Sequence, residues 1–258
     1  MKKPVLAVAL MLSLAGCSAP TPALSPTATV KDTLTGTITV FAAASVTDTF
    51  AQIADAFTAK HPGVEVVVNF GGSSGLATQI VQGAPADVFA AASGATMKTV
   101  TDAALTRAEP VAFATNTLEI AVPAGNPGSV TELADLENPD LIVALCAVAV
   151  PCGAAAQTVL NTAGIVASVD TYEQDVKAVL TKVELGEVDA GLVYTTDILA
   201  AGDAVEGIEF SESDAAVGTY PIAQLTASAN PDAAAAFIEF VLSPAGKRIL
   251  DAAGFGAP

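Results

Sequence analysis

Short apolar runs alternate with amphipathic stretches along the first third of the chain. Residues 37–41, 64–70 and 87–91 are rich in β-branched and other apolar side chains, which predicts three strands. Between them, apolar residues recur at helical spacing over 46–60, and a shorter helix is expected over 76–82. The order β-α-β-α-β predicts a parallel sheet covered by helices.

The rest of the chain repeats this pattern. Helices are expected over 95–103, 130–136, 151–161, 172–185, 233–242 and 243–250, and strands or extended segments over 110–113, 119–122, 141–145, 190–194, 208–210 and 219–225. We therefore predict an α/β fold of two lobes, each a mainly parallel sheet flanked by helices, with two hinge crossings near 116–117 and 219–225. The first lobe comprises 37–115 and 221–258, and the second 116–220. Ligands bind in such folds at the carboxyl ends of parallel strands, in the cleft between lobes.

The overall charge restricts the classes of ligand. The net charge of −17 argues against nucleic acid, because that binding needs Lys and Arg to neutralise phosphates. The same charge repels small anions at long range. An anion site in this chain would therefore need short-range backbone and hydroxyl donors in a desolvated pocket.

The N-terminus has the pattern of an export signal. Lys2 and Lys3 precede an apolar run over 5–14 that is too short to span a membrane. Leu-Ala-Gly-Cys then resembles a bacterial lipobox, so we expect 1–16 to be removed and Cys17 to carry the lipid. An ordinary cleaved signal, with Cys17 incidental, is the alternative. Residues 17–36 are rich in Pro, Thr, Ser and Ala and predict a disordered tether.

Export also bears on the two remaining cysteines. In a secreted chain, Cys146 and Cys152 favour a disulfide. Their spacing does not match a zinc site, and no histidine lies near them in the sequence.

Four strand-to-helix junctions have small or hydroxyl residues at a helix start. They are Ser45, Ser73-Ser74, Cys152-Gly153 and Asp175-Val176. A helix start carries unpaired N–H groups and a partial positive charge, so it can receive an anion. Ser45 could alternatively be an ordinary N-cap, with Asp48 completing a capping-box-like pattern. If the sheets are doubly wound, all four junctions would converge on the cleft.

A hydrolase is the alternative class of function. Gly71-Gly72-Ser73-Ser74-Gly75 matches the G-x-S-x-G elbow, with Ser73 as the nucleophile. That fold needs a histidine after the serine, whereas the single histidine, His61, precedes it and is expected at a helix end. We interpret the carboxylates of Asp87, Asp175 and Asp197 as caps or internal hydrogen-bond acceptors. The chain is therefore not expected to be an enzyme.

Several motifs, taken in order, carry a family resemblance. Phe41-Ala42-Ala43-Ala44-Ser45, Gly71-Gly72-Ser73-Ser74-Gly75, Gly83-Ala84-Pro85-Ala86-Asp87, Val150-Pro151-Cys152-Gly153, Glu173-Gln174-Asp175-Val176 and Gly191-Leu192-Val193-Tyr194 resemble the molybdate-binding proteins of ABC importers. Each motif is weak alone, but their order and spacing match over roughly 37–258.

The resemblance implies a set of ligand-binding residues. Ser45 and Ser73 would supply hydroxyl and backbone donors from the first lobe. Cys152 and Val176 would supply backbone N–H groups from the second lobe, and Tyr194 its phenol. Ser74 is an additional candidate. The enterobacterial form of the family has alanine where this chain has Cys152, and a backbone donor tolerates that change.

The chemistry of the expected ligand fits such a site. Molybdate and tungstate are fully deprotonated near neutral pH, so a site made only of donors satisfies them. Hydrogen phosphate carries a proton that needs an acceptor. Sulfate accepts hydrogen bonds only, so a receptor for sulfate or another tetrahedral oxyanion is the alternative within the same class. The residues do not distinguish molybdate from tungstate.

The resemblance also implies the protein's partners and location. We expect a monomeric extracytoplasmic lipoprotein, held at the membrane only through Cys17, that delivers its anion to an ABC permease. Neither a cofactor nor a bare metal cation is expected.

Overall fold

Two five-stranded sheets organise the computed structural model, which describes residues 33–258. The predicted signal peptide, the lipid attachment site Cys17 and the tether as far as residue 32 lie outside the described residues. In the part of the chain that is described, no helix is both long and apolar enough to cross a membrane.

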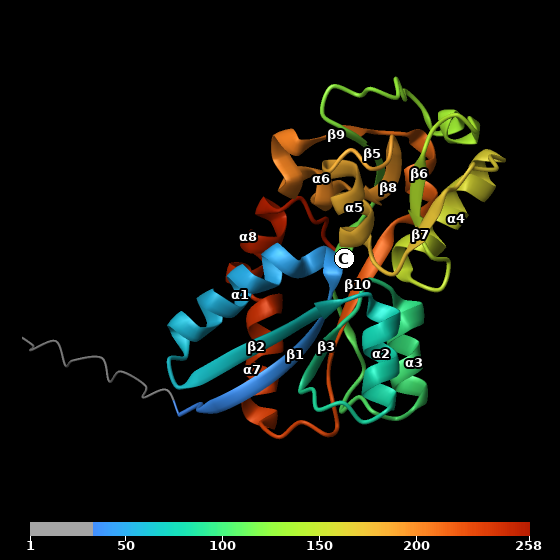
Figure 1. Cartoon of the computed structure of the whole chain (residues 1–258). Helices are drawn as coiled ribbons and strands as arrows, with labels where there is room; N and C mark the ends of the chain where they lie inside the picture. Colours follow the sequence, from blue (N-terminus) through green and yellow to red (C-terminus); the bar gives the residue numbers. More distant parts are fainter. Residues whose placement is uncertain (1–32) are drawn as a thin grey trace, which may run out of the picture. The chain divides into compact units, whose positions relative to one another are not determined.

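The first sheet has the strand order β2-β1-β3-β10-β4 (Figure 1). Its strands are β1 (Gly36–Ala43), β2 (Val64–Gly71), β3 (Val88–Ala90), β4 (Val111–Asn116) and β10 (Gly218–Gln224). β1 pairs in parallel with β2 and β3, whereas β10 runs antiparallel to β3 and β4. The sheet is therefore mixed, and its antiparallel strand comes from late in the chain.

Helices cover both faces of this sheet (Figure 1). On one face, α1 (Thr47–Lys60), α7 (Pro231–Leu242) and α8 (Pro244–Ala252) pack over the strands. The rings of Phe57 in α1 and Phe237 in α7 lie with their centroids 5.4 Å apart. On the other face, α2 (Ser73–Val81) and α3 (Gly94–Asp102) bury Leu76 and Met97 beside Phe89. We call this sheet with its helices the first lobe.

The second sheet has the matching order β7-β6-β8-β5-β9. Its strands are β5 (Leu118–Pro123), β6 (Val143–Cys146), β7 (Thr171–Glu173), β8 (Ala190–Tyr194) and β9 (Val205–Ile208). The helices α4 (Pro151–Ala163), α5 (Val176–Glu184) and α6 (Thr195–Ala201) pack with it around one hydrophobic core. β6 pairs in parallel with β7 and β8, and β5 runs antiparallel to β8 and β9. This sheet with its helices is the second lobe.

The chain passes between the sheets twice. Thr117 alone joins β4 to β5, and the segment containing the 3₁₀ helix Ser211–Ala216 joins β9 to β10. The predicted α/β fold with two lobes and two crossings is confirmed, but the second crossing lies at 209–217, because most of the predicted crossing, 219–225, forms β10 of the first sheet. The division into two lobes that move as rigid bodies stays a prediction, because the described residues form one compact unit.

Some predicted elements differ from the observed ones. Residues 171–173, predicted in part as helix, form β7, since Leu145 of β6 pairs with Tyr172. The predicted helix over 130–136 is a 3₁₀ helix at Leu133–Glu137, and α6 was not predicted. Pairing with β6 makes this segment a strand, and local propensity does not encode such pairing.

Candidate functional site

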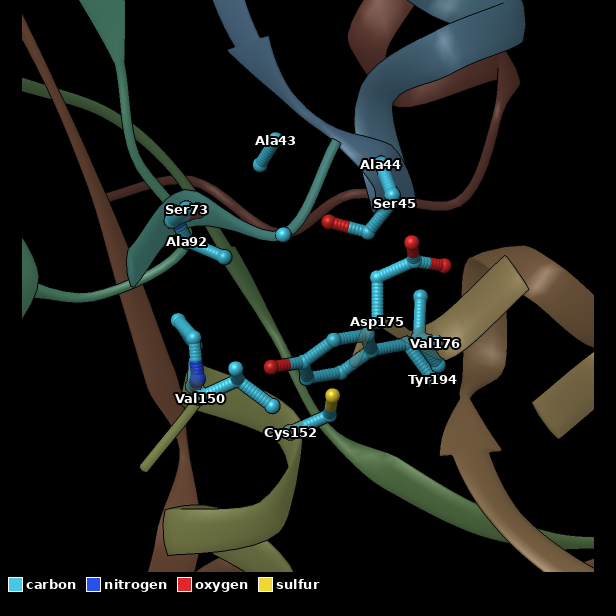
Figure 2. Close-up of a pocket in the computed structure, with 12 residues that line it drawn as sticks. Ala43, Ala44, Ser45, Ser73, Ala92, Val150, Cys152, Asp175, Val176 and Tyr194 are labelled. Atoms are coloured by element: carbon cyan, nitrogen blue, oxygen red, sulfur yellow. The ribbon is translucent and has the colours of Figure 1, made fainter. Parts of the chain in front are cut away.

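A small cavity lies where elements of the two lobes meet (Figure 2). The cavity volume, measured as the space that the centre of a water molecule can reach, is about 20 Å³. A single water needs about 10–15 Å³ on the same measure. Only a very small ligand fits such a space. Its lining residues are Ala43, Ala44, Ser45, Gly72, Ser73, Ala92, Val150, Pro151, Cys152, Asp175, Val176 and Tyr194.

The structure brings five of the six predicted ligand residues to this cavity. They are all at most 7 % exposed: Ser45, Ser73, Cys152, Val176 and Tyr194. Ser74 lies apart from them and donates its hydroxyl to the Ala149 carbonyl oxygen at 2.6 Å, across the two lobes. That these residues bind an anion stays a prediction.

Three α-helices begin at the cavity. Gly72 precedes α2, Pro151 is the first residue of α4, and Asp175 caps α5. The first N–H groups of a helix have no intrahelical partner, and the helix start carries a partial positive charge. Pro151 has no N–H, so Cys152 presents the first available N–H of α4. The cavity is therefore surrounded by backbone donors from both lobes.

Ser45 does not cap α1, so the N-cap interpretation was wrong. It lies inside a 3₁₀ turn, Ala44–Val46, and α1 has Val46 at its N-cap position without a side-chain hydrogen bond. Ser45 Oγ instead lies 3.0 Å from the hydroxyl of Tyr220. Its side chain points into the cavity rather than back along the helix (Figure 2).

The Ser73 hydroxyl, like that of Ser45, is held by a hydrogen bond to a neighbouring residue. Its Oγ accepts a hydrogen bond from the Ala92 N–H at 3.1 Å. A hydroxyl that accepts from a protein donor still has its own proton to donate. Ser73 can therefore present a donor to the cavity.

The predicted disulfide joins Cys146 to Cys152. It ties the end of β6 to the first turn of α4, and it closes the short loop that carries Ala149 and Val150. A side chain at Gly153 would place its Cβ 2.0 Å from the Ala147 carbonyl oxygen, so only glycine fits against this loop. The loop and the start of α4 are held in close contact by both features.

A buried carboxylate lies behind Tyr194. Asp197 is 1 % exposed, and its Oδ2 accepts a hydrogen bond from the Tyr194 N–H at 3.2 Å. Its Oδ1 lies 3.4 Å from Lys177 Nζ, and among the described residues this oxygen has no hydrogen-bond partner. Burial raises the pKa of Asp197 to about 6, although Lys177 acts in the opposite direction.

Lys177 also connects the two lobes. Its Nζ lies 3.1 Å from Asp48 in the first turn of α1, in addition to its contact with Asp197. Burial disfavours the charged amine, but the charges of Asp197 and Asp48 outweigh it and raise the pKa of Lys177. Lys177 therefore stays charged and offsets two of the carboxylates near the cavity.

Tyr194 is held as a neutral phenol. Burial raises its pKa well above the usual range, and the neighbouring Tyr220 and Asp197 act in the same direction. The phenol keeps its proton at physiological pH, so it remains a hydrogen-bond donor beside the cavity (Figure 2).

The structure also tests the remaining carboxylate and histidine interpretations. Asp175 caps α5 by accepting from the Ala178 N–H at 3.0 Å, and Asp87 accepts from the Thr39 N–H at 2.7 Å. Both are the structural acceptors that were predicted.

His61 follows the last residue of α1, whose first turn is near the cavity. Fourteen residues of helix separate the two ends by about 21 Å, so His61 is remote from Ser73.

Two contributors were not found from the sequence. Tyr220 reaches Ser45 from β10, 175 positions later in the chain, and Lys177 reaches Asp48 from the other lobe. No local pattern marks either contact. The described residues contain no cluster of three or more His, Cys, Asp or Glu that could hold a metal ion.

Comparisons with known proteins give a consistent assignment. Residues 38–256 match the family model described as "Bacterial extracellular solute-binding protein". The chain is 43 % identical to the molybdate-binding protein ModA of Mycobacterium tuberculosis over 96 % of its own length and 95 % of the relative's.

Two solved structures share the fold. The periplasmic molybdate-binding protein of Azotobacter vinelandii is 21 % identical with a TM-score of 0.77, over 86 % of this chain and 99 % of that one. The sulfate-binding protein SubI of Mycobacterium tuberculosis is 19 % identical with a TM-score of 0.71, over 85 % and 86 %. The fold alone is therefore shared by receptors named for different oxyanions.

The raised pKa of Asp197 predicts a pH-dependent effect of Asp197→Asn. The native state binds the proton more tightly than the unfolded chain, so Asp197 contributes stability that is fully present below pH 4 and lost as the pH rises through about 6. Relative to wild type, D197N should gain on the order of 3 kcal/mol between these limits.

Urea unfolding of both proteins from pH 4 to pH 7 measures this difference. Asp140→Asn, at an exposed position, serves as the control and should show a flat difference. A flat difference for D197N as well would contradict the buried-carboxylate interpretation.

Proposed function

The chain belongs to the bacterial extracellular solute-binding protein family, and we propose that it captures molybdate in the interlobe cavity and delivers it to an ABC permease. The observation that carries this proposal is the convergence of helix starts and hydroxyls from both lobes on one small cavity. The relative that is 43 % identical is named as a molybdate-binding protein, which supports this ligand.

The donors around the cavity suit a small, fully deprotonated oxyanion. We assign ligand contacts to the hydroxyls of Ser45 and Ser73, the N–H groups of Cys152 and Val176, and the Tyr194 phenol. A hydrogen bond to a charged group contributes roughly 1.5–3 kcal/mol, so a few such contacts can hold a dianion without Lys or Arg. Tungstate has the same charge and acceptor pattern, and we propose it as a second ligand.

One carboxylate, Asp175, lies among the lining residues. One of its oxygens is engaged by the Ala178 N–H, and its side chain is only partly buried. The carboxylate disfavours an anion, and the nearby Lys177 offsets the two other carboxylates. Binding must therefore come from contact hydrogen bonds rather than from long-range attraction.

We further propose that the two lobes close on the anion. Contacts that cross between them include the Ser74 hydroxyl on Ala149, the Lys177–Asp48 ion pair and the Asn116 amide on Thr196 Oγ1. The two sheets with their helices would then move as two bodies about the crossings, close to the predicted division into 37–115 with 221–258 and 116–220. The same proposal places the protein outside the cytoplasm as a monomer anchored through Cys17.

Isothermal titration calorimetry with four anions tests the ligand assignment. Molybdate and tungstate should bind tightly at one site per chain, and sulfate and phosphate should bind more weakly. Sulfate has the right hydrogen-bond pattern but a different size, and phosphate carries a proton at neutral pH. Tight sulfate binding with no molybdate heat would overturn the assignment in favour of the sulfate receptor.

Gly72→Ala tests whether the close approach of the lobes matters for binding. A Cβ at position 72 would lie 2.3 Å from the Gln174 carbonyl oxygen of the second lobe. Overpacking of this kind costs about 1–3 kcal/mol, so molybdate affinity should fall roughly 5- to 150-fold.

The control is Gly75→Ala on the same helix, where a Cβ meets nothing within 4 Å. G75A should retain wild-type affinity and gain up to about 1 kcal/mol of stability from helix propensity. Equal affinities for G72A and wild type would mean that binding does not need this approach.

A further inference from the structure

Lys177 lies beside the cavity without lining it. It is the second residue of α5 and directly follows Val176, whose N–H the proposed function places on the anion. The same helix packs against the 3₁₀ turn Ala44–Val46 of the first lobe, which carries Ser45. Figure 2 shows Ser45 and Val176 on the same side of the cavity. The contact between α5 and this turn therefore brings together one proposed ligand residue from each lobe.

The Lys177 ammonium has one buried partner and one exposed partner. Asp197, in the same lobe, is 1 % exposed, and its Oδ1 lies 3.4 Å from Lys177 Nζ. Among the described residues this oxygen has no hydrogen-bond partner, so removing the ammonium would leave a buried charge uncompensated. Asp48, in the first lobe, lies 3.1 Å from Nζ and is 62 % exposed, so water can replace the lysine there. When the lobes separate, the contact that breaks is therefore the one with Asp48.

Asp48 has two opposite effects on an anion in the cavity. Its carboxylate repels the anion, but the exposed position and the adjacent Lys177 weaken that repulsion. Its ion pair with Lys177 joins the first turn of α1 to the start of α5. An exposed ion pair usually contributes little, because two flexible side chains must be ordered. Here Asp197 already holds the lysine, and the aspartate side chain is short. We therefore expect the effect of the ion pair to exceed the repulsion.

We propose that Lys177 and Asp48 are positioning residues: their ion pair must break before the lobes open, and it thereby slows the release of the bound anion. This inference rests on the proposed function and on the closure of the lobes that it includes. Neither residue touches the anion. The ion pair acts by keeping the proposed ligand residues of the two lobes close together.

Asp48→Asn tests the proposal through the rate of release. The complex with radiolabelled molybdate is mixed with excess unlabelled molybdate at low ionic strength, and the loss of label is followed. D48N should release molybdate about two- to fivefold faster than wild type, the range for an ion pair of this strength. Removal of a negative charge alone would slow the release. Slower or unchanged release from D48N would therefore overturn the proposal.

The salt dependence gives a second readout. At about 1 M salt the Debye length falls to about 3 Å, so the ion pair is largely screened. Wild type and D48N should then release molybdate at similar rates. A ratio of the two rates that is the same at low and at high salt would contradict a role of the ion pair.

Lys177→Met completes a double-mutant cycle. In the K177M background, D48N should no longer accelerate release, because the ion pair is already absent. The same acceleration with and without the lysine would mean that Asp48 acts on its own helix, and the proposal would fail. K177M leaves Asp197 unpaired, so thermal unfolding checks that each variant is folded. If K177M is unfolded, the sign and the salt dependence of the D48N effect decide the proposal.

Asp102→Asn is the matched control. Asp102 forms an exposed ion pair with Lys98 within α3, so this pair does not cross between the lobes. D102N should release molybdate at the wild-type rate at both salt concentrations. Acceleration equal to that of D48N would show a general effect of charge and overturn the proposal. Failure of the wild-type protein to bind molybdate would instead overturn the proposed function.

Discussion

The site depends on unpaired N–H groups at helix starts, because the chain has little else with which to attract an anion. Its net charge is −17, and no lysine or arginine is among the residues that line the cavity. Long-range electrostatics therefore oppose anion binding, and short-range hydrogen bonds must overcome them. Backbone N–H groups suit this purpose because folding fixes their direction, so little reorganisation is needed when the anion arrives.

The two sheets explain how so many donors reach one place. Both have the same arrangement of three parallel strands followed by two antiparallel pairings, β2-β1-β3-β10-β4 in the first and β7-β6-β8-β5-β9 in the second. The helix that follows a parallel strand begins at the carboxyl end of that strand. With the lobes facing each other, the starts of α2 from one side and of α4 and α5 from the other surround the same cavity. The disulfide and Gly153 then hold the α4 start close to its own loop.

Sequence reasoning found the parts of the site that are encoded locally. The strands, the apolar face of α1 and the residues at each helix start follow from periodicity and from small residues in strand-to-helix turns. The local pattern correctly placed Ser45 at the end of β1, but the N-cap interpretation was wrong, because a 3₁₀ turn places its hydroxyl against Tyr220.

Contacts between distant parts of the chain could not be found in this way. Tyr220 and Lys177 act across the fold, and β7 forms only because β6 is beside it. Such contacts depend on tertiary packing, which a single sequence pattern does not record.

The most direct test of the account is a crystal structure of the protein with tungstate, measured at the tungsten absorption edge. The anomalous signal locates the metal without reference to any assumed contact. We predict one strong peak in the cavity, with oxygens within hydrogen-bond distance of the Ser45 and Ser73 hydroxyls and the Cys152 and Val176 N–H groups. A fully soaked crystal with no peak in this cavity, or with its main peak elsewhere, would contradict the account.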